Sequence, residues 1–277
     1  MEFSRIVLEQ SGPVAYVTMN RPAVHNAFDE KLIAEMIQAF AQLAESGQTR
    51  VAVLQGAGAS FSAGADLEWM QRMAGYTREE NLADAAALQQ MFDTIARAPF
   101  LTIARVHGAA IGGGIGLVAV CDVAIAENTE RHVPAKPKQF GLSEVRLGLA
   151  PAVIAPYILR KIARGVAHSL FLTGRRFTAE EARSIGLVQQ VVEPGDLDRA
   201  VSRVIEDALM AGPAAVAATK NLMYDIEDKT PGEAAAITTE CIATLRSSPE
   251  GQEGINAFLQ KRHPSFSIHS DQTQPGL

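Results

Sequence analysis

One carboxylate lies where the chain favours proton transfer. Glu144 is the only acidic residue in the stretch 140–149, where most neighbours are apolar or glycine. Burial among such neighbours raises the pKa of a carboxyl group and suits it to general acid–base catalysis near neutral pH. An ion pair with Arg146, or a cap on the following helix, is the alternative role for this side chain.

Two loops rich in glycine and alanine are the second chemical feature. Residues 61–67 read FSAGADL and residues 107–116 read HGAAIGGGIG. Each loop follows a predicted strand and leads into a predicted helix, where backbone N–H groups are free and small side chains let a ligand approach. Two such N–H groups can converge on one oxygen as an oxyanion hole. Tight turns between helix and sheet are the alternative for either loop alone.

The elements that carry these loops alternate between strand and helix. Apolar residues at helical spacing predict a helix over 29–46, and capping signals predict helices over 77–97 and 179–185. Short apolar runs at 51–54, 101–106 and 123–126 predict buried strands. This order predicts an α/β fold with a parallel sheet. We expect a core over 1–194, a helical oligomerisation segment over 195–262 and a flexible tail over 263–277.

Composition excludes several classes of function. The chain has 277 residues, 47% of them hydrophobic, and a net charge of −6, which opposes a nucleic-acid-binding face. No dinucleotide or P-loop fingerprint, serine-hydrolase elbow or zinc-binding HExxH is present, so no metal site is expected. Cys121 and Cys241 are expected as reduced thiols. With no signal peptide or membrane span recognised, we expect a cytoplasmic protein.

Together, the two loops and Glu144 resemble the crotonase superfamily, the enoyl-CoA hydratase/isomerase group. The resemblance implies a crotonase-like spiral of ββα and βαβ turns, followed by a C-terminal helical trimerisation segment. It also implies an acyl-CoA thioester as substrate, no further cofactor, and a homotrimer or a hexamer built as a dimer of trimers. The matching stretches follow the family's order along nearly the whole chain: 20–22 with 26–27, 61–67, 106–116 with 121–122, 140–151, 170–174, 182–188 and 257–262.

The resemblance also assigns roles by position. It implies that the backbone N–H groups of Ala63 and Gly113 form the oxyanion hole and that Glu144 is catalytic. Phe258 and Lys261 match positions that contact CoA, often from a neighbouring subunit, although a core position and a solvated one are the alternatives. The remaining residues expected at the substrate or its CoA arm, besides Ala63 and Gly113, are Gly64, Ala65, Asp66 and Leu67.

One position departs from the family pattern. Hydratases with two catalytic glutamates carry the first one just after the triple glycine, where this chain has Gly116. A single glutamate suits either hydration of a 2-enoyl-CoA, with Glu144 serving both proton transfers, or isomerisation of a 3-enoyl-CoA to the 2-enoyl form. A catalytically silent acyl-CoA-binding protein is the third hypothesis.

A finer resemblance favours hydration. Residues 67–74, 78–81 and 142–154 resemble the methylglutaconyl-CoA hydratase branch, which implies leucine or acyclic-terpene catabolism and a substrate with a second carboxylate. A cation beside the acyl pocket would suit that group. Arg72, Arg78 and Arg146 are the candidates, with an ordinary surface role as the alternative. The polar loop 128–139 precedes Glu144 and is expected to affect access to the pocket.

Overall fold

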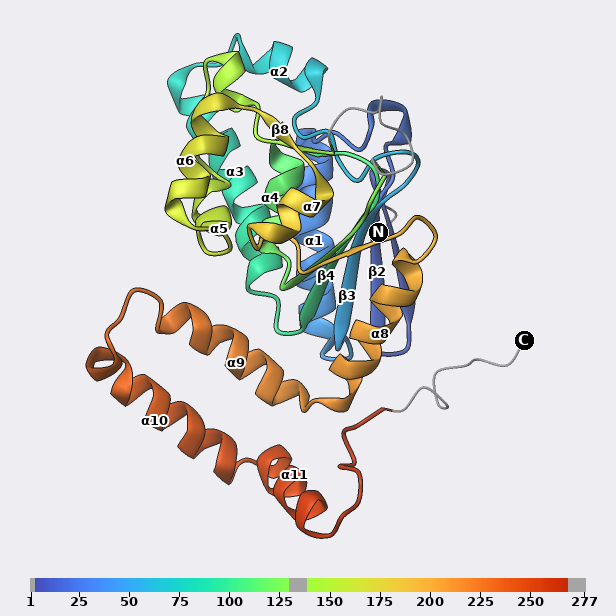
Figure 1. The fold of residues 1–277 in the computed structure, drawn as a ribbon, viewed down its shortest axis with the longest axis vertical. Coiled ribbons are helices and arrows are strands. Elements are labelled where there is room, and N and C mark those ends of the chain that lie inside the picture. The colour runs from blue at the N-terminus through green and yellow to red at the C-terminus, as the bar shows by residue number, and fades with distance from the viewer. Residues whose placement is uncertain (1–2, 130–138, 269–277) are drawn as a thin grey trace.

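A six-stranded sheet forms the centre of the molecule (Figure 1). The computed structural model describes residues 3–129 and 139–268. The strand order is β1-β2-β3-β4-β6-β9, and every neighbouring pair is parallel except β1 and β2. The bounds of these strands are β1 Ile6–Ser11, β2 Val14–Met19, β3 Val51–Gly56, β4 Leu101–Val106, β6 Val123–Glu127 and β9 Gln190–Val192.

A second, three-stranded sheet holds the segment that leads to Glu144. Its order is β5-β7-β8, with β5 parallel to β7 and β7 antiparallel to β8. The pairing of Ala110 with Phe140 therefore joins the second glycine-rich loop to the strand just before Glu144. The bounds are β5 Ala110–Ile111, β7 Phe140–Gly141 and β8 Arg176–Phe177.

Helices cover both faces of the large sheet, as parallel sheets require. Ala52 and Leu54 of β3 belong to the core that includes α1, whereas Val51 and Val53 belong to the core on the opposite face, with α8. The helices up to α8 are α1 Glu30–Ser46, α2 Leu67–Met73, α3 Arg78–Ala96, α4 Gly113–Val120, α5 Ala155–Leu159, α6 Arg164–Thr173, α7 Ala179–Ser184 and α8 Leu197–Met210; short 3-10 turns are η1 Pro22–Val24 and η2 Glu144–Leu147.

The last three helices are α9 Pro213–Asp225, α10 Pro231–Ser247 and α11 Pro249–Leu259. Figure 1 shows them as an arm at the end of the molecule opposite α2. The expected boundary after residue 194 is too early, because α8 packs its apolar face on the sheet and belongs to the core. The arm exposes several large apolar side chains: Met223, Ile242, Ile255, Phe258 and Leu259.

The helix caps that the sequence predicts are present in the structure. Asp29 caps α1 and Thr77 forms the capping box of α3, as predicted. Between residues 151 and 164, α5 ends at Leu159 and α6 begins only at Arg164, so two separate helices form here. Helix α2 is the helix predicted after the first loop, and it spans Leu67–Met73. Among the described helices none is long and apolar enough to cross a bilayer, and both cysteines are free.

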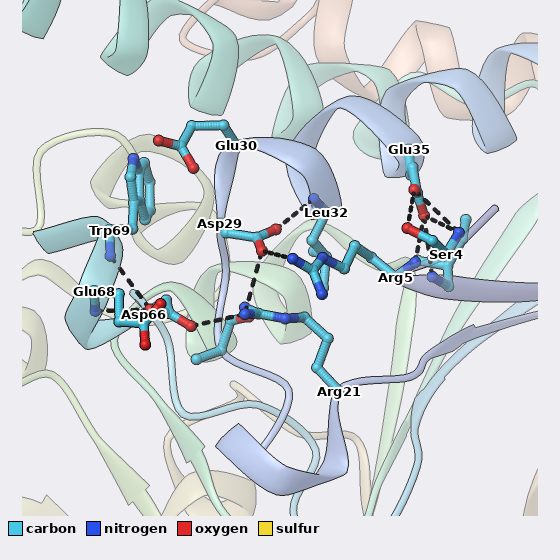
Figure 2. Close-up of polar contacts among 12 residues, drawn as sticks. Ser4, Arg5, Arg21, Asp29, Glu30, Leu32, Glu35, Asp66, Glu68 and Trp69 are labelled. Atoms are coloured by element: carbon cyan, nitrogen blue, oxygen red, sulfur yellow. Dashed lines mark hydrogen bonds and ion pairs between the residues drawn. The ribbon is translucent and has the colours of Figure 1, made fainter. Parts of the chain in front are cut away.

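Arg21 ties together the starts of two helices (Figure 2). Its Nη2 lies 3.2 Å from Asp29 Oδ2 and 2.9 Å from Asp66 Oδ2. Asp29 caps α1 by accepting from Leu32 N–H, and Asp66 caps α2 by accepting from the N–H groups at 68 and 69. Burial alone would raise the pKa of Asp66, but these bonds and Arg21 hold that pKa below its usual range. One guanidinium therefore joins the start of α1 to the end of the loop 61–67.

Replacing Arg21 tests this tie. Arg21→Met leaves the buried Asp66 carboxylate without its cation, and such losses cost about 3–5 kcal/mol. We expect a matching fall in the free energy of unfolding in urea. Arg183→Met, which breaks an exposed pair with Glu180, should cost at most about 1 kcal/mol. Equal losses in the two variants would show that Arg21 acts as an ordinary surface arginine.

Candidate active site

A cavity of about 570 Å³ lies beside Glu144. Helices α2 and α3, the start of α4 and the segment 147–154 enclose it. Most lining side chains are apolar, so the cavity can take an acyl chain. The lining residues are Phe28, Ala65, Trp69, Met70, Met73, Ala74, Asn81, Asp84, Ala85, Leu88, Gly113, Glu144, Leu147, Leu149, Ala150, Pro151, Ala152, Val153 and Ile154.

Glu144 begins the 3-10 turn η2 directly after the small sheet. Burial raises the pKa of its carboxyl group, only partly offset by a backbone hydrogen bond. Oε2 is buried and has no hydrogen-bond partner among the described residues. Oε1 lies against the second loop, since a Cβ built on Gly112 would lie 3.2 Å from it. A buried carboxylate with one unpartnered oxygen is suited to take and return protons. The alternative roles of an ion pair or a helix cap do not fit these contacts.

The position predicted for one oxyanion donor needs correction. Ala63 donates its backbone N–H to the carbonyl oxygen of His25 at 2.9 Å. That bond uses the donor, and Ala63 does not line the cavity. Ala63 therefore serves to fix the loop rather than to bind a thioester oxygen.

Ala65, rather than Ala63, is the residue of the first loop whose N–H is placed as an oxyanion donor. Ala65 forms a parallel bridge with Phe28, in which Phe28 N–H donates to Gly64 O and Asp66 N–H donates to Phe28 O. The N–H of Ala65 consequently points away from Phe28, and Ala65 lines the cavity together with Gly113. Gly113 opens α4, where the first N–H groups have no partner within the helix.

The two loops are in close contact at these donors. A Cβ built on Gly64, whose φ is +85°, would lie 2.7 Å from Ile111 O and 3.3 Å from Gly113 N. Only glycine allows that approach. The structure thus brings Ala65, Gly113 and Glu144 to one cavity, as an oxyanion-stabilising site with a proton carrier requires.

Comparison with known proteins agrees with this geometry. A family model described as enoyl-CoA hydratase/isomerase matches residues 9–269. The chain belongs to the enoyl-CoA hydratase/isomerase family. Among its relatives, crotonyl-CoA hydratase of Syntrophomonas wolfei subsp. wolfei is 32% identical over 96% of this chain and 99% of that protein. (E)-benzylidenesuccinyl-CoA hydratase of Thauera aromatica is 32% identical over 94% and 98%.

Solved structures confirm the crotonase-like fold. An enoyl-CoA hydratase from Shewanella pealeana has a TM-score of 0.88 at 38% identity, with 95% of this chain and 96% of that chain covered. The ββα beginning and the later βαβ turns of this family member agree with the α/β spiral expected from sequence.

The other residues expected at CoA lie outside the cavity. The carboxylate of Asp66 is buried and bound to Arg21 and two backbone N–H groups, and contact of this residue with CoA stays a prediction. Leu67 is exposed at the start of α2. Phe258 is 82% exposed and, with Lys261, lies in or just after α11, so the core alternative for Phe258 is excluded within one chain. Their contact with CoA remains a prediction.

The three candidate arginines do not line the acyl cavity of this hydratase/isomerase family member. Arg72 is held by Glu30, with Nη2 lying 2.7 Å from Glu30 Oε2. Arg146 is exposed on η2 and Arg78 is exposed at the start of α3. Of the loop 128–139, residues 130–138 lie outside the described residues.

Phe92 and Ile154 fill the space at Gly116. A Cβ built there would lie 2.4 Å from Ile154 Cγ2 and 2.8 Å from Phe92 Cζ. Such distances are too short for carbon atoms. The position that carries the first glutamate in two-glutamate hydratases has no room for any side chain in this chain.

The cavity also contains two residues that the sequence did not indicate. Trp69 donates its Nε1–H to Asp84 Oδ1 at 3.1 Å, and both side chains line the cavity. Burial raises the pKa of Asp84, against the lowering effect of the Trp69 bond. The spacing of Asp84, Leu88 and Phe92 on one face of α3 is the signal that could have found this residue. Within residues 3–129 and 139–268, no group of acidic, histidine or cysteine side chains could hold a metal ion.

Adding a methyl group at Gly116 tests the packing there. Gly116→Ala forces Ile154 and Phe92 apart, and overpacking of this kind costs about 1–3 kcal/mol. Gly165→Ala is the control, because a Cβ there meets nothing within 4 Å. We expect urea unfolding to show the loss only for Gly116→Ala. A neutral result at Gly116 would mean that the space is open.

Glu144 should destabilise the fold when it is ionised. Because burial raises its pKa, the folded state binds this proton more tightly than the unfolded chain. The stabilisation is complete below the unfolded carboxyl pKa of about 4.3 and is lost as pH rises through the folded pKa. Glu144→Gln should therefore melt at a higher temperature than wild type at pH 7, with the difference shrinking toward pH 4.

Differential scanning calorimetry between pH 4 and pH 8 gives this measurement. Glu45→Gln, on the exposed end of α1, is the matched control. If Glu144→Gln melts below wild type throughout that range, the carboxylate contributes to stability and the assigned burial cost is wrong.

Proposed function

We propose that this family member is an enoyl-CoA hydratase, which adds water reversibly across the C2–C3 double bond of a 2-enoyl-CoA thioester. The observation that carries the proposal is the unpartnered, buried Oε2 of Glu144 in the same cavity as Ala65 and Gly113. Membership of the family supports an acyl-CoA thioester as substrate, and relatives of this chain include proteins named as hydratases.

The chemistry follows from these groups. The thioester oxygen accepts hydrogen bonds from the N–H groups of Ala65 and Gly113, and these stabilise the negative charge that develops as the oxygen of water bonds to C3. One such donor is typically worth roughly 3–4 kcal/mol in the transition state. The enolate then takes a proton at C2. With Gly116 in place of a second glutamate, Glu144 delivers the proton to C2, and a base must also take the proton that water loses.

Isomerisation is the second candidate, and the packing at Gly116 favours it. An isomerase needs one base that removes a proton from C2 of a 3-enoyl-CoA and returns it at C4. Phe92 and Ile154 leave no place for a second glutamate at position 116. This reaction adds no water, so the two candidates differ in their product.

The acyl chain is a finer proposal. Resemblance to the methylglutaconyl-CoA hydratase branch supports a branched chain with a second carboxylate. The two relatives are named for crotonyl-CoA and for (E)-benzylidenesuccinyl-CoA, so similarity at this level does not select an acyl group. The described cavity lining contains no lysine or arginine, which makes a direct comparison of substrates necessary.

We also propose a homotrimer, or a hexamer built from two trimers. The exposed apolar side chains on α10 and α11 support an interface between copies of the chain, since large apolar patches on a protein surface favour association. Contact of Phe258 and Lys261 with the CoA of a neighbouring subunit belongs to the same proposal. A cytoplasmic location stays a prediction.

The ultraviolet absorbance of the conjugated thioester measures hydration directly. We expect wild type to consume crotonyl-CoA or 3-methylglutaconyl-CoA, with the faster substrate identifying the acyl class. Glu144→Gln should bind acyl-CoA but lose about 10²–10⁴-fold in kcat, the usual contribution of an acid–base group. Glu45→Gln should keep wild-type activity.

Each other outcome has a distinct meaning. Near-normal turnover by Glu144→Gln would remove Glu144 from the mechanism. No absorbance loss with either substrate, together with new absorbance from a 3-enoyl-CoA, would identify an isomerase. Saturable CoA binding without turnover of any enoyl thioester would identify a silent acyl-CoA-binding protein.

A further inference from the structure

Two carboxylates are the only titratable side chains that line the cavity within the described part of the chain: Glu144 and Asp84. Hydration moves two protons, one away from water and one to C2. Two acid–base groups in one apolar cavity match those two steps, whereas a binding pocket for an uncharged acyl chain needs no second carboxylate.

Asp84 is held in one orientation. Its Oδ1 accepts the Trp69 Nε1–H at 3.1 Å, and Trp69 is itself only 2% exposed. This bond joins α2 to α3 across the cavity. The second oxygen, Oδ2, makes no hydrogen bond or ion pair with another described residue. A fixed carboxylate with one oxygen engaged leaves the other for a ligand in the cavity.

The surrounding charges leave Asp84 without a cation. Glu30 is the charged neighbour that raises the pKa of Asp84 further, beyond the effect of burial. Arg72, which lies close to Glu30, is engaged by it in a pair at 2.7 Å. Asp84 is therefore not half of an ion pair, which would be the ordinary reason for a carboxylate on a half-buried helix face.

Helix α3 fixes the position of Asp84 relative to the space at Gly116, which Phe92 and Ile154 fill. Phe92, which occupies the space at Gly116, lies eight positions further along α3 than Asp84. At about 1.5 Å of rise per residue, this corresponds to roughly 12 Å along the helix axis. Leu88 lines the cavity between them. The face of α3 that fills the space at Gly116 with Phe92 thus also carries Asp84, about two helical turns before Phe92, at the cavity.

We propose that Asp84 is the second catalytic carboxylate of this enzyme and acts on the water that adds to C3. The inference rests on the proposed hydratase function. In the hydration direction, Asp84 accepts a proton from water as its oxygen bonds to C3. The C2–C3 π electrons pass to the thioester oxygen, giving the enolate. Protonated Glu144 then delivers its proton to C2, and solvent returns both carboxyl groups to their starting states. Water is added and nothing is oxidised or reduced.

Asp84→Asn is the decisive variant. Asparagine keeps an Oδ1 that can accept the Trp69 bond, so the link between α2 and α3 is preserved while the proton acceptor is lost. We expect kcat for hydration of the better substrate to fall about 10²-fold or more, with KM changing less than about threefold. Thermal melting of the variant should show an intact fold.

Trp69→Phe is the complementary control variant, because it removes the hydrogen bond to Asp84 and keeps the Asp84 carboxylate. It should retain at least about a tenth of wild-type kcat, since only the positioning of Asp84 is weakened. Asp93→Asn, on the exposed face of α3 where Asp93 pairs with Arg97, should leave hydration unchanged.

Hydrogen exchange at C2 of butyryl-CoA in deuterium oxide separates the two carboxylates. This exchange needs enolate stabilisation and Glu144 but no addition of water. Asp84→Asn should therefore keep the exchange while it loses hydration, and Glu144→Gln should lose both.

Four results would overturn the role of Asp84. Hydration by Asp84→Asn at the wild-type rate would remove it from the mechanism. An equal loss in Trp69→Phe, or a parallel loss of hydration and exchange in Asp84→Asn, would show that Asp84 only supports the shape of the cavity. A KM rise without a kcat fall would make it a substrate-binding residue. If wild type hydrates no enoyl-CoA at all, the proposed hydratase function is wrong. If wild type hydrates an enoyl-CoA and Asp84→Asn does so at the same rate, only the role of Asp84 is wrong.

Discussion

The ion pairs of Arg21 with Asp29 and Asp66 are the interaction on which the active site depends. Both aspartates are buried helix caps, so each would be costly without a cation. Their shared partner fixes the start of α1 relative to the start of α2. Between these two points lies the bridge from Phe28 to Ala65, which turns the N–H of Ala65 away from Phe28, and Ala65 lines the cavity.

Secondary structure provides the second half of the site. Strand β5 pairs with both the segment at Ser62 and strand β7, so one short strand joins the first loop to the turn that carries Glu144. Helix α4 begins at Gly113 and contributes its unpaired N–H groups at the same place. The site thus depends on the backbone pairing of short segments in the small sheet and at the Ser62–Ala110 bridge.

The sequence predicted the features that depend on local pattern. Capped helices such as α1 and α3, the apolar strands, and the burial that raises the pKa of Glu144 could be inferred from residue types and spacing. The choice between Ala63 and Ala65 could not, because it depends on which N–H is engaged by His25, far along the chain. Asp66 looked like a ligand residue because its partner, Arg21, is distant in sequence. Asp84 escaped notice because the side chain that bonds to it, Trp69, lies on another helix.

The packing at Gly116 constrains how this site can change over evolutionary time. A glutamate at that position would require smaller residues in place of both Ile154 and Phe92 beforehand, and each of those changes alone would open a cavity in the core. Every single-step route to a two-glutamate site therefore passes through less stable intermediates. Proton transfer at this site therefore depends on carboxyl groups at other positions of the cavity lining, such as Glu144.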